Sequence, residues 1–322
     1  MNDFPLITVG VACFNGCDTI ERAIQSACGQ IWKNLEILIV DDASTDGSIE
    51  LIERLAKEDD RIRVIRNQEN AGIGSVRNTI IDHANGDFIA FFDDDDDSLP
   101  DRLKLQYERI CTYEESSEAK IVVCHTARTQ VLPDGAERYE MTHGAEFANT
   151  APNGPKVAER VLIGRPDGHG SGPMATCSQM ARKSVYQSVG GFDPSLRRSE
   201  DSDFIIRVAF AGGHFIGIEE PLVRQHITVS SEKDIEVERR YSLMWLDKHR
   251  EFLERIGWLN HARLWLDIKY DYLSGHRLRF FMRMLWLLVC HPAKTSQRLL
   301  WSFPNRQHSR AAAELIRKFH HR

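Results

Sequence analysis

Five consecutive aspartates, Asp93 to Asp97, directly follow the apolar run 88–92. The apolar run is typical of a buried strand, and the Ser-Leu-Pro after the acids is typical of a turn into a helix. In open α/β sheets, ligands bind at the carboxyl ends of the strands. Five like charges at one point repel one another, and a hard divalent cation such as Mg²⁺ or Mn²⁺, carrying a phosphate, would relieve this repulsion. A solvated acidic turn is the alternative interpretation.

Further polar residues follow other predicted elements. Asp41 and Asp42 end a second apolar run, where they could accept hydrogen bonds from a base or ribose, or from their own turn. Gly72 and Gly74 precede a predicted helix, and their lack of a side chain would let the backbone approach a ligand closely. Arg77, about one turn into that helix, could point toward a phosphate or base, or could pair with a neighbouring acid.

Two later features could contribute chemistry of their own. Glu200 and Asp201 begin a predicted helix after the sharp turn 190–194, which would aim this helix end. A carboxylate held there could act as a general base, although acids in a first helical turn also simply offset the helix macrodipole. His226 ends a predicted strand; a lone histidine is usually a packing or surface residue, but imidazole also accepts Mn²⁺.

The elements that must position these residues alternate between strand and helix over the first 127 residues. This alternation predicts an α/β fold with a mainly parallel sheet and helices on both faces. The expected strands cover 7–13, 35–40, 62–65, 88–92 and 121–125, and the expected helices cover 19–27, 48–57, 75–84 and 100–113.

The remainder of the chain has a different pattern. Residues 128–175 are rich in turn signals and predict a hairpin and mobile loops, which beside an α/β sheet often carry specificity. A helix over 204–210 and two short strands, 215–218 and 222–225, follow. From residue 233 the pattern is helical throughout, with helices expected over 234–256, 259–274 and 276–290 and after Pro292. We therefore expect a catalytic domain over 1–230 and an all-α region over 231–322.

The charge of the chain is strongly asymmetric. Residues 239–322 carry 17 basic and 6 acidic side chains, a balance of +11, whereas residues 1–238 carry 24 basic and 41 acidic side chains, a balance of −17. The acidic first part argues against nucleic-acid binding. The basic last part favours an anionic partner, and a membrane surface is one candidate. Packing of these helices on the acidic domain or on a second subunit is the alternative.

The cysteines and the termini point to a cytosolic protein. Seven cysteines are an odd number without zinc-type spacing, so we expect reduced thiols rather than disulfides or structural zinc. The first residues lack the basic region and long apolar core of a signal peptide. The most apolar late segment, 284–290, is far shorter than the ~20 residues that span a bilayer.

Taken in series, these motifs resemble those of the family 2 glycosyltransferases with the GT-A fold, a Rossmann-like fold. The resemblance covers residues 5–230 and is specific because several motifs occur in the same order. They are Val-Ala-Cys-Phe-Asn at 11–15, Val-Asp-Asp-Ala-Ser-Thr-Asp-Gly at 40–47, Asn-Ala-Gly-Ile-Gly at 70–74 with Arg77, the acids from Asp93, Gly-Gly-Phe-Asp at 190–193 with Glu-Asp at 200–201, and the late His226. The family more often has tyrosine at the position of Phe14.

The resemblance implies a role for each matching residue. Asp42 would contact the nucleotide base, with Phe14, Gly72 and Arg77 close to the nucleotide sugar. Asp93 and Asp94 would lie near the ribose and phosphates.

By that resemblance, Asp95 would ligate Mn²⁺ or Mg²⁺, His226 would be a further metal or phosphate contact, and Asp201 would deprotonate the acceptor hydroxyl. The implied activity is inverting transfer from a nucleotide-diphosphate sugar, by default a UDP-sugar, to a hydroxyl of a glycan or lipid-linked acceptor in cell-surface polysaccharide synthesis. The implied location is the cytoplasm, with peripheral binding to the cytoplasmic face of the inner membrane through the helical region, which could instead form a homo-oligomer.

Two other activities compete with this interpretation. A sugar nucleotidyltransferase would share the sheet and the metal, but it usually has a glycine-rich basic loop after the first strand, which residues 13–18 do not offer. A non-catalytic nucleotide- or metal-binding module would make Glu200 and Asp201 a helix start only. Release of product in the presence of donor and metal would separate such a module from an enzyme.

Overall fold

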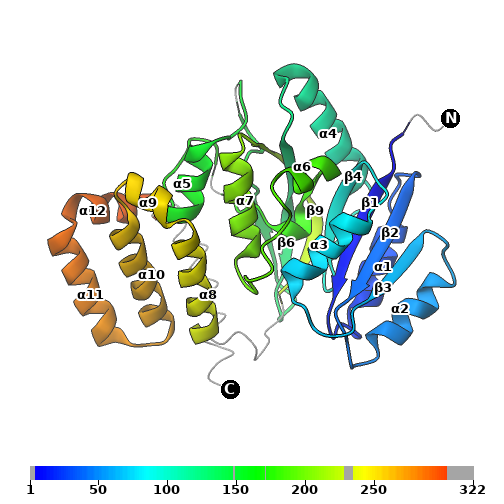
Figure 1. Ribbon diagram of the computed structural model, residues 1–322, viewed down its shortest axis with the longest axis horizontal. Coiled ribbons are helices and arrows are strands. Elements are labelled where there is room, and N and C mark those ends of the chain that lie inside the picture. Colours follow the sequence, from blue (N-terminus) through cyan, green and yellow to red (C-terminus); the bar gives the residue numbers. More distant parts are fainter. Residues whose placement is uncertain (1–3, 148, 171, 228–234, 303–322) are drawn as a thin grey trace. The chain divides into compact units, whose positions relative to one another are not determined.

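The computed structural model describes residues 4–147, 149–170, 172–227 and 235–302 (Figure 1). The chain divides into two compact units, which we describe separately. The first unit contains residues 1–155 and 168–228, and the second contains residues 156–167 and 229–322.

The first unit is built on a mixed, nine-stranded sheet. Its strands are β1 (Ile7–Cys13), β2 (Leu35–Asp41), β3 (Ile62–Arg66), β4 (Phe88–Asp93), β5 (Asp97–Ser98), β6 (Val122–Val131), β7 (Glu137–Glu140), β8 (Met180–Arg182) and β9 (His214–His226). They are ordered β3-β2-β1-β4-β8-β6-β9-β5, with β7 paired to β6. The pairs β1–β2, β1–β4, β2–β3 and β6–β9 are parallel. The predicted α/β class is confirmed, with a sheet that is mixed.

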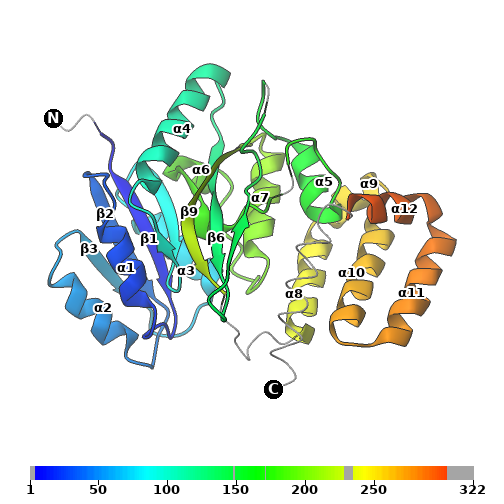
Figure 2. The ribbon, with the colours of Figure 1, turned by 180° about the vertical axis from the view of Figure 1, so that it is seen from behind.

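Helices cover both faces of this sheet. They are α1 (Ile20–Cys28), α2 (Ser48–Ala56), α3 (Ile73–His83), α4 (Arg102–Ser117), α6 (Lys183–Ser188) and α7 (Glu200–Phe210). Figure 1 shows α3, α6 and α7 on the near face, and Figure 2 shows α1 and α2 on the opposite face. Alternate residues of β1 fill the core beneath α1, because successive side chains of a strand point to opposite faces.

One glycine of β1 shows how closely α3 approaches the sheet. A Cβ atom on Gly10 would lie 2.4 Å from Cγ2 of Ile80, which is fully buried on α3. The absent side chain therefore lets α3 pack directly on the centre of the sheet. This packing fixes the helix that carries Arg77.

The region predicted to hold a hairpin and loops is more ordered than expected. β6 and β7 form the hairpin around the Pro-Asp-Gly turn, as predicted. A helix that the sequence did not reveal, α5 (Pro155–Ile163), follows. The two strands expected over 215–218 and 222–225 are one strand, β9, because a shift in the β6–β9 register accommodates residues 219 and 220 without ending the strand.

The second unit contains α8 (Ile235–Lys248), α9 (Arg250–Arg255), α10 (Leu259–Leu273), α11 (Arg277–Cys290) and α12 (Pro292–Trp301). The single helix expected over 234–256 is divided at His249, where no glycine or proline signals a break; residue 234 lies outside the described residues. Polar contacts join α8 to α10, among them a 2.9 Å hydrogen bond between the hydroxyls of Ser242 and Tyr270. Across the described parts of the chain, we find no helix with the length and apolar character needed to traverse a bilayer.

Candidate active site

The carboxyl ends of β1, β2 and β4 lie side by side and bring the first group of predicted residues together. Ala12 of β1 pairs with Asp93 of β4, and Cys13 pairs with Asp41 of β2. The backbone N–H of Phe14 donates a 3.2 Å hydrogen bond to Oδ2 of Asp94. The side chain of Phe14 is about half exposed, at 46%. An exposed aromatic ring beside these acids could contact a planar ligand.

Asp42 holds a loop in place. Its Oδ1 accepts hydrogen bonds from Asn67 Nδ2 at 2.7 Å and from the Ala71 N–H at 2.9 Å, and its Oδ2 accepts one from the Gly72 N–H at 2.9 Å. Asp42 is buried, and Gly72 has a φ of 85°, which favours glycine. The sequence suggested either a ligand contact or a turn, and the structure places Asp42 in a network with the loop that precedes α3.

Arg77 connects two parts of the site. Its Nη1 donates a 2.6 Å hydrogen bond to Oε1 of Glu200, and its Nη2 lies 3.6 Å from Oδ1 of Asp93. The guanidinium is buried and lies 5.2 Å from the ring centroid of Phe192, the range of a cation–π contact. The acid pairing considered from the sequence is therefore present, and it joins the end of β4 to the start of α7.

Asp201 lies at the second position of α7, next to Glu200. Its Oδ1 accepts a 2.6 Å hydrogen bond from the backbone N–H of Ser202. Burial alone would lower the pKa of Arg77, but the charges of Glu200, then Asp93, then Asp201 outweigh it and raise that pKa. Ser199, directly before the helix, has a φ of 64°, in the left-handed region. This local turn directs the first residues of α7 toward Arg77. The candidate base and the acid cluster thus share one basic neighbour.

The five aspartates do not share one environment. Burial, and then the charges of Asp95 and Asp93, raise the pKa of Asp94 to about 7. Burial and the charge of Asp93 raise the pKa of Asp95, and burial followed by the charges of Asp93 and Asp95 raises that of Asp96. Because both effects disfavour the charged form, a cation among these groups would stabilise it.

The predicted metal ligand His226 contacts two neighbours of Asp95 in the aspartate turn. Nε2 of His226 lies 2.7 Å from Oδ1 of Asp97, and the His226 N–H donates a 2.9 Å hydrogen bond to Oδ1 of Asp96. Asp97 also lies 3.5 Å from Nε of Arg22. His226 therefore anchors the end of β9 to the aspartate turn, and its imidazole is engaged by Asp97.

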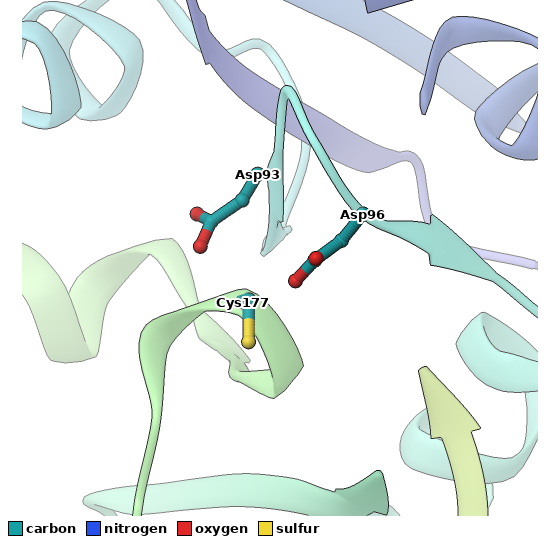
Figure 3. Close-up of side chains that lie close together, drawn as sticks. All are labelled: Asp93, Asp96 and Cys177. Carbon is teal, nitrogen blue, oxygen red and sulfur yellow. The ribbon is translucent and has the colours of Figure 1, made fainter. Parts of the chain in front are cut away.

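A different trio offers ligand atoms close together. A carboxylate oxygen of Asp93, one of Asp96 and Sγ of Cys177 all lie within 4.8 Å of one another. Figure 3 shows the three side chains close together, with Cys177 on the short 3-10 helix η1 (Thr176–Ser178). Oδ2 of Asp96 is buried and has no hydrogen-bond partner among the described residues. An unpartnered buried carboxylate oxygen fits a site for a divalent cation.

The sequence placed Asp96 in the acidic cluster without a role of its own, and it did not single out Cys177. Nη1 of Arg128 on β6 lies 3.4 Å from the Cys177 sulfur, and burial raises the pKa of the Cys177 thiol to about 12. A protonated thiol is a poor ligand for a hard cation. No spacing in the sequence links Cys177 to the aspartates, because 80 residues and several elements separate them. All seven cysteines are free, as predicted.

Comparison of the sequence with known proteins gives a family match and several relatives. The family model for glycosyl transferase family 2 matches residues 8–185. The chain is 43% identical over 105 residues to the succinoglycan biosynthesis protein ExoO of Rhizobium meliloti, a match that covers 33% of this chain and 30% of ExoO. The chain thus spans about a third of the length of ExoO.

Two solved structures share the fold. The S. aureus TarS structure (residues 1–349 of that protein) in complex with UDP-GlcNAc has a TM-score of 0.54 and 17% identity, covering 94% of this chain and 92% of the other. The mannosyltransferase PcManGT from Pyrobaculum calidifontis, in complex with GDP-Man and Mn²⁺, has a TM-score of 0.59 and 15% identity, covering 98% and 86%. At these identities the likeness concerns the fold alone.

Proposed function

The chain belongs to glycosyl transferase family 2, and on that premise we propose that it transfers a sugar from a nucleotide-diphosphate sugar to a hydroxyl group. The observation that carries the proposal is the link through Arg77, which contacts Asp93 at the end of β4 and Glu200 beside Asp201. A donor held at the strand end would thereby lie close to a carboxylate that could act on an acceptor. The proposed donor is a UDP-sugar, the default for this family resemblance.

The proposed donor site lies along the ends of β1, β2 and β4. Phe14 would contact the nucleotide, and the loop held by Asp42 would present Gly72 to it. Asp93 and Asp94 would lie near the ribose and phosphates. The mobility of this loop would be small, because three hydrogen bonds fix it to one buried carboxylate.

The proposed cation is Mn²⁺ or Mg²⁺. Asp95 is a ligand by family resemblance, and Asp93 and Asp96 are candidates by their position. His226 would support the site through Asp97 and Asp96. When bound, such an ion neutralises the charge that develops on a diphosphate leaving group.

Asp201 is the proposed general base. Its carboxylate would accept the proton of the acceptor hydroxyl while that oxygen attacks the anomeric carbon from the face opposite the leaving group. One base and one displacement imply inversion at that carbon. Arg77 would hold Glu200 in place through their hydrogen bond, and Asp201, beside it, would be the carboxylate that meets the acceptor.

The proposed setting is cell-surface polysaccharide synthesis in the cytoplasm, with a glycan or lipid-linked acceptor. The similarity to ExoO, a succinoglycan biosynthesis protein, supports this setting. The test is a screen for nucleotide-diphosphate release across a panel of UDP-, GDP- and TDP-sugars with Mn²⁺ or Mg²⁺ and candidate acceptors. Release with one donor, together with the opposite anomer in the product, would support the proposal. Donor binding without release under any condition would favour a non-catalytic module.

A further inference from the structure

Helix α11 presents an apolar face that no described residue covers. Six large apolar side chains on this face are between 63% and 75% exposed. They are Leu278 (75%), Phe281 (65%), Met282 (64%), Leu285 (65%), Trp286 (63%) and Val289 (70%). Their spacing of three and four residues places them on one side of the helix. We refer to these six residues as the α11 stripe.

The opposite side of α11 is packed within the second unit. Leu287 is fully buried, and Nη1 of Arg283 donates a 2.7 Å hydrogen bond to Oδ2 of Asp271 on α10. The rings of Phe280 and Tyr272 lie 5.7 Å apart. The inner side of the helix therefore holds it in place, and the stripe lies on the outer side.

The charged side chains of α11 and α12 are all of one sign. Residues 277–301 contain five basic side chains, Arg277, Arg279, Arg283, Lys294 and Arg298, and no acidic ones. By the 3.6-residue period, Arg277 and Arg279 lie about 90–110° to either side of the stripe. Both are exposed, whereas Arg283 is engaged by Asp271. An apolar stripe with basic residues on both flanks complements a surface that is apolar inside and anionic outside.

We infer that the α11 stripe inserts into the interfacial region of an anionic phospholipid bilayer. Phe281 and Trp286 have the ring types that favour the boundary between headgroups and acyl chains, and the flanking arginines would meet lipid phosphates. The helix would lie in the plane of the surface, since it is too short to span a bilayer. Two copies packed on each other through the same stripe would bring their basic flanks together. Repulsion between these like charges disfavours a dimer at this face.

This inference stands independently of the proposed transferase activity. It is tested by flotation of the full-length protein with phosphatidylcholine vesicles in which about one lipid in three is phosphatidylglycerol. The anionic lipid gives these vesicles a strongly negative surface potential. We expect binding to these vesicles, none to pure phosphatidylcholine, and a loss of at least about tenfold in binding between low salt and about 1 M salt, where the Debye length is only about 3 Å.

Three variants separate the contribution of the apolar stripe to vesicle binding from that of its basic flanks. Leu285→Glu with Trp286→Glu should abolish flotation, because it places two charges at the centre of the stripe. Arg277→Glu with Arg279→Glu should weaken binding about tenfold or more, since it reverses both flanks. Met244→Glu on α8, where the side chain is 41% exposed, is the matched control and should bind as wild type. All sites are exposed, so thermal melting curves should be unchanged.

Three outcomes would contradict the inference that the stripe binds lipid. Failure of the wild-type protein to float with anionic vesicles at low salt would overturn the inference. A wild-type dimer in sedimentation that the stripe variant converts to a monomer, without vesicle binding, would assign the stripe to a second copy. Binding that persists in the stripe variant would place the lipid contact elsewhere.

Discussion

Nη1 of Arg77 donates a 2.6 Å hydrogen bond to Oε1 of Glu200, although 123 residues separate them in the chain. Both side chains are buried, so each charge depends on the other for compensation. Through the same guanidinium, the start of α7 is tied to Asp93 at the end of β4. The geometry of the proposed donor site and that of the proposed base are therefore coupled.

Breaking this pair should be costly. Arg77→Met leaves Glu200 buried without a cation, and we expect the free energy of unfolding to fall by about 3–5 kcal/mol. Urea unfolding of Arg77→Met, Glu200→Gln and the double variant would measure this. The double variant should lose less than the sum of the two single losses, because removing both charges leaves neither one uncompensated. Strict additivity would contradict the coupling.

Asp95→Ala should abolish transfer but leave the fold intact. The substitution removes a proposed metal ligand and also one member of a mutually repelling cluster, so stability should stay the same or rise. The measurements are nucleotide-diphosphate release across a Mn²⁺ titration and a thermal melt. Full activity of Asp95→Ala in metal-free buffer would refute a metal role for this residue.

Cys177→Ala is a matched control for the metal site. Its sulfur lies near Asp93 and Asp96, but a thiol with a pKa of about 12 stays protonated near neutral pH. We therefore expect Mn²⁺-dependent turnover within about threefold of wild type. A rise of more than tenfold in the Mn²⁺ concentration needed for half activity would instead place the sulfur among the ligands.

Asp201→Asn should separate catalysis from binding. Asparagine can still accept the Ser202 N–H hydrogen bond through its amide oxygen, but it cannot take up a proton as a carboxylate does. Turnover should fall by about 10²–10⁴-fold with donor affinity unchanged. Steady-state kinetics and donor titration give the two quantities. Glu200→Gln is the comparison, and it should reduce stability more and turnover less. Normal turnover at saturation with weakened donor affinity would make Asp201 a binding residue.

The sequence predicted the first half of the sheet well because buried parallel strands are continuous apolar runs. β1 begins and ends where predicted, and β2 and β4 each extend one residue further, into Asp41 and Asp93. β8 has only three residues, too few to show a period, and it was not predicted. α5 was also missed, since its surroundings are rich in glycine and proline.

The site residues were found where a motif lies in one stretch of chain, and missed where the fold alone brings groups together. Asp95 and Asp201 were named from their local motifs, and their proposed roles await the tests above. Neither the hydrogen bonds from residues 67–72 to Asp42 nor the position of Cys177 beside Asp96 has a local signal. Such contacts depend on the crossing of elements that are distant in sequence, which periodicity does not encode.

Asp42→Asn should loosen the loop before α3. In asparagine an amide nitrogen replaces one carboxylate oxygen, and a nitrogen that carries hydrogens cannot accept a hydrogen bond. The variant would therefore lose either the bond from the Gly72 N–H or the bonds from Asn67 and Ala71. Because a buried N–H group would lose its acceptor, we expect a loss of about 1–3 kcal/mol in the free energy of unfolding. We also expect a higher KM for the nucleotide sugar. Chemical denaturation and kinetics would measure both. Unchanged stability with weakened donor binding would indicate that Asp42 contacts the donor directly rather than through the loop.

Acid sensitivity should arise in part from His125 on β6. The residue is fully buried, and neither ring nitrogen has a hydrogen-bond partner among the described residues. Burial, and then the cationic neighbours Arg128, His143 and Arg102, lower the pKa of His125 to about 3. The folded protein therefore keeps this imidazole neutral at pH values where the unfolded chain, with a histidine pKa of about 6.5, takes up a proton.

The sign of the effect follows from this difference. Between about pH 6.5 and about pH 3 the unfolded state binds more protons at this position, so stability falls as the pH is lowered, by about 1.4 kcal/mol per pH unit. His125→Phe removes the titrating group, and because the ring has no hydrogen bonds to lose, it should cost little at pH 7.5. We expect the variant to gain about 2 kcal/mol over wild type between pH 7.5 and pH 5, measured by urea unfolding at both values. If the free energy of unfolding changed with pH by the same amount in both proteins, the pKa of His125 would be the same in the folded and unfolded states, contrary to this prediction.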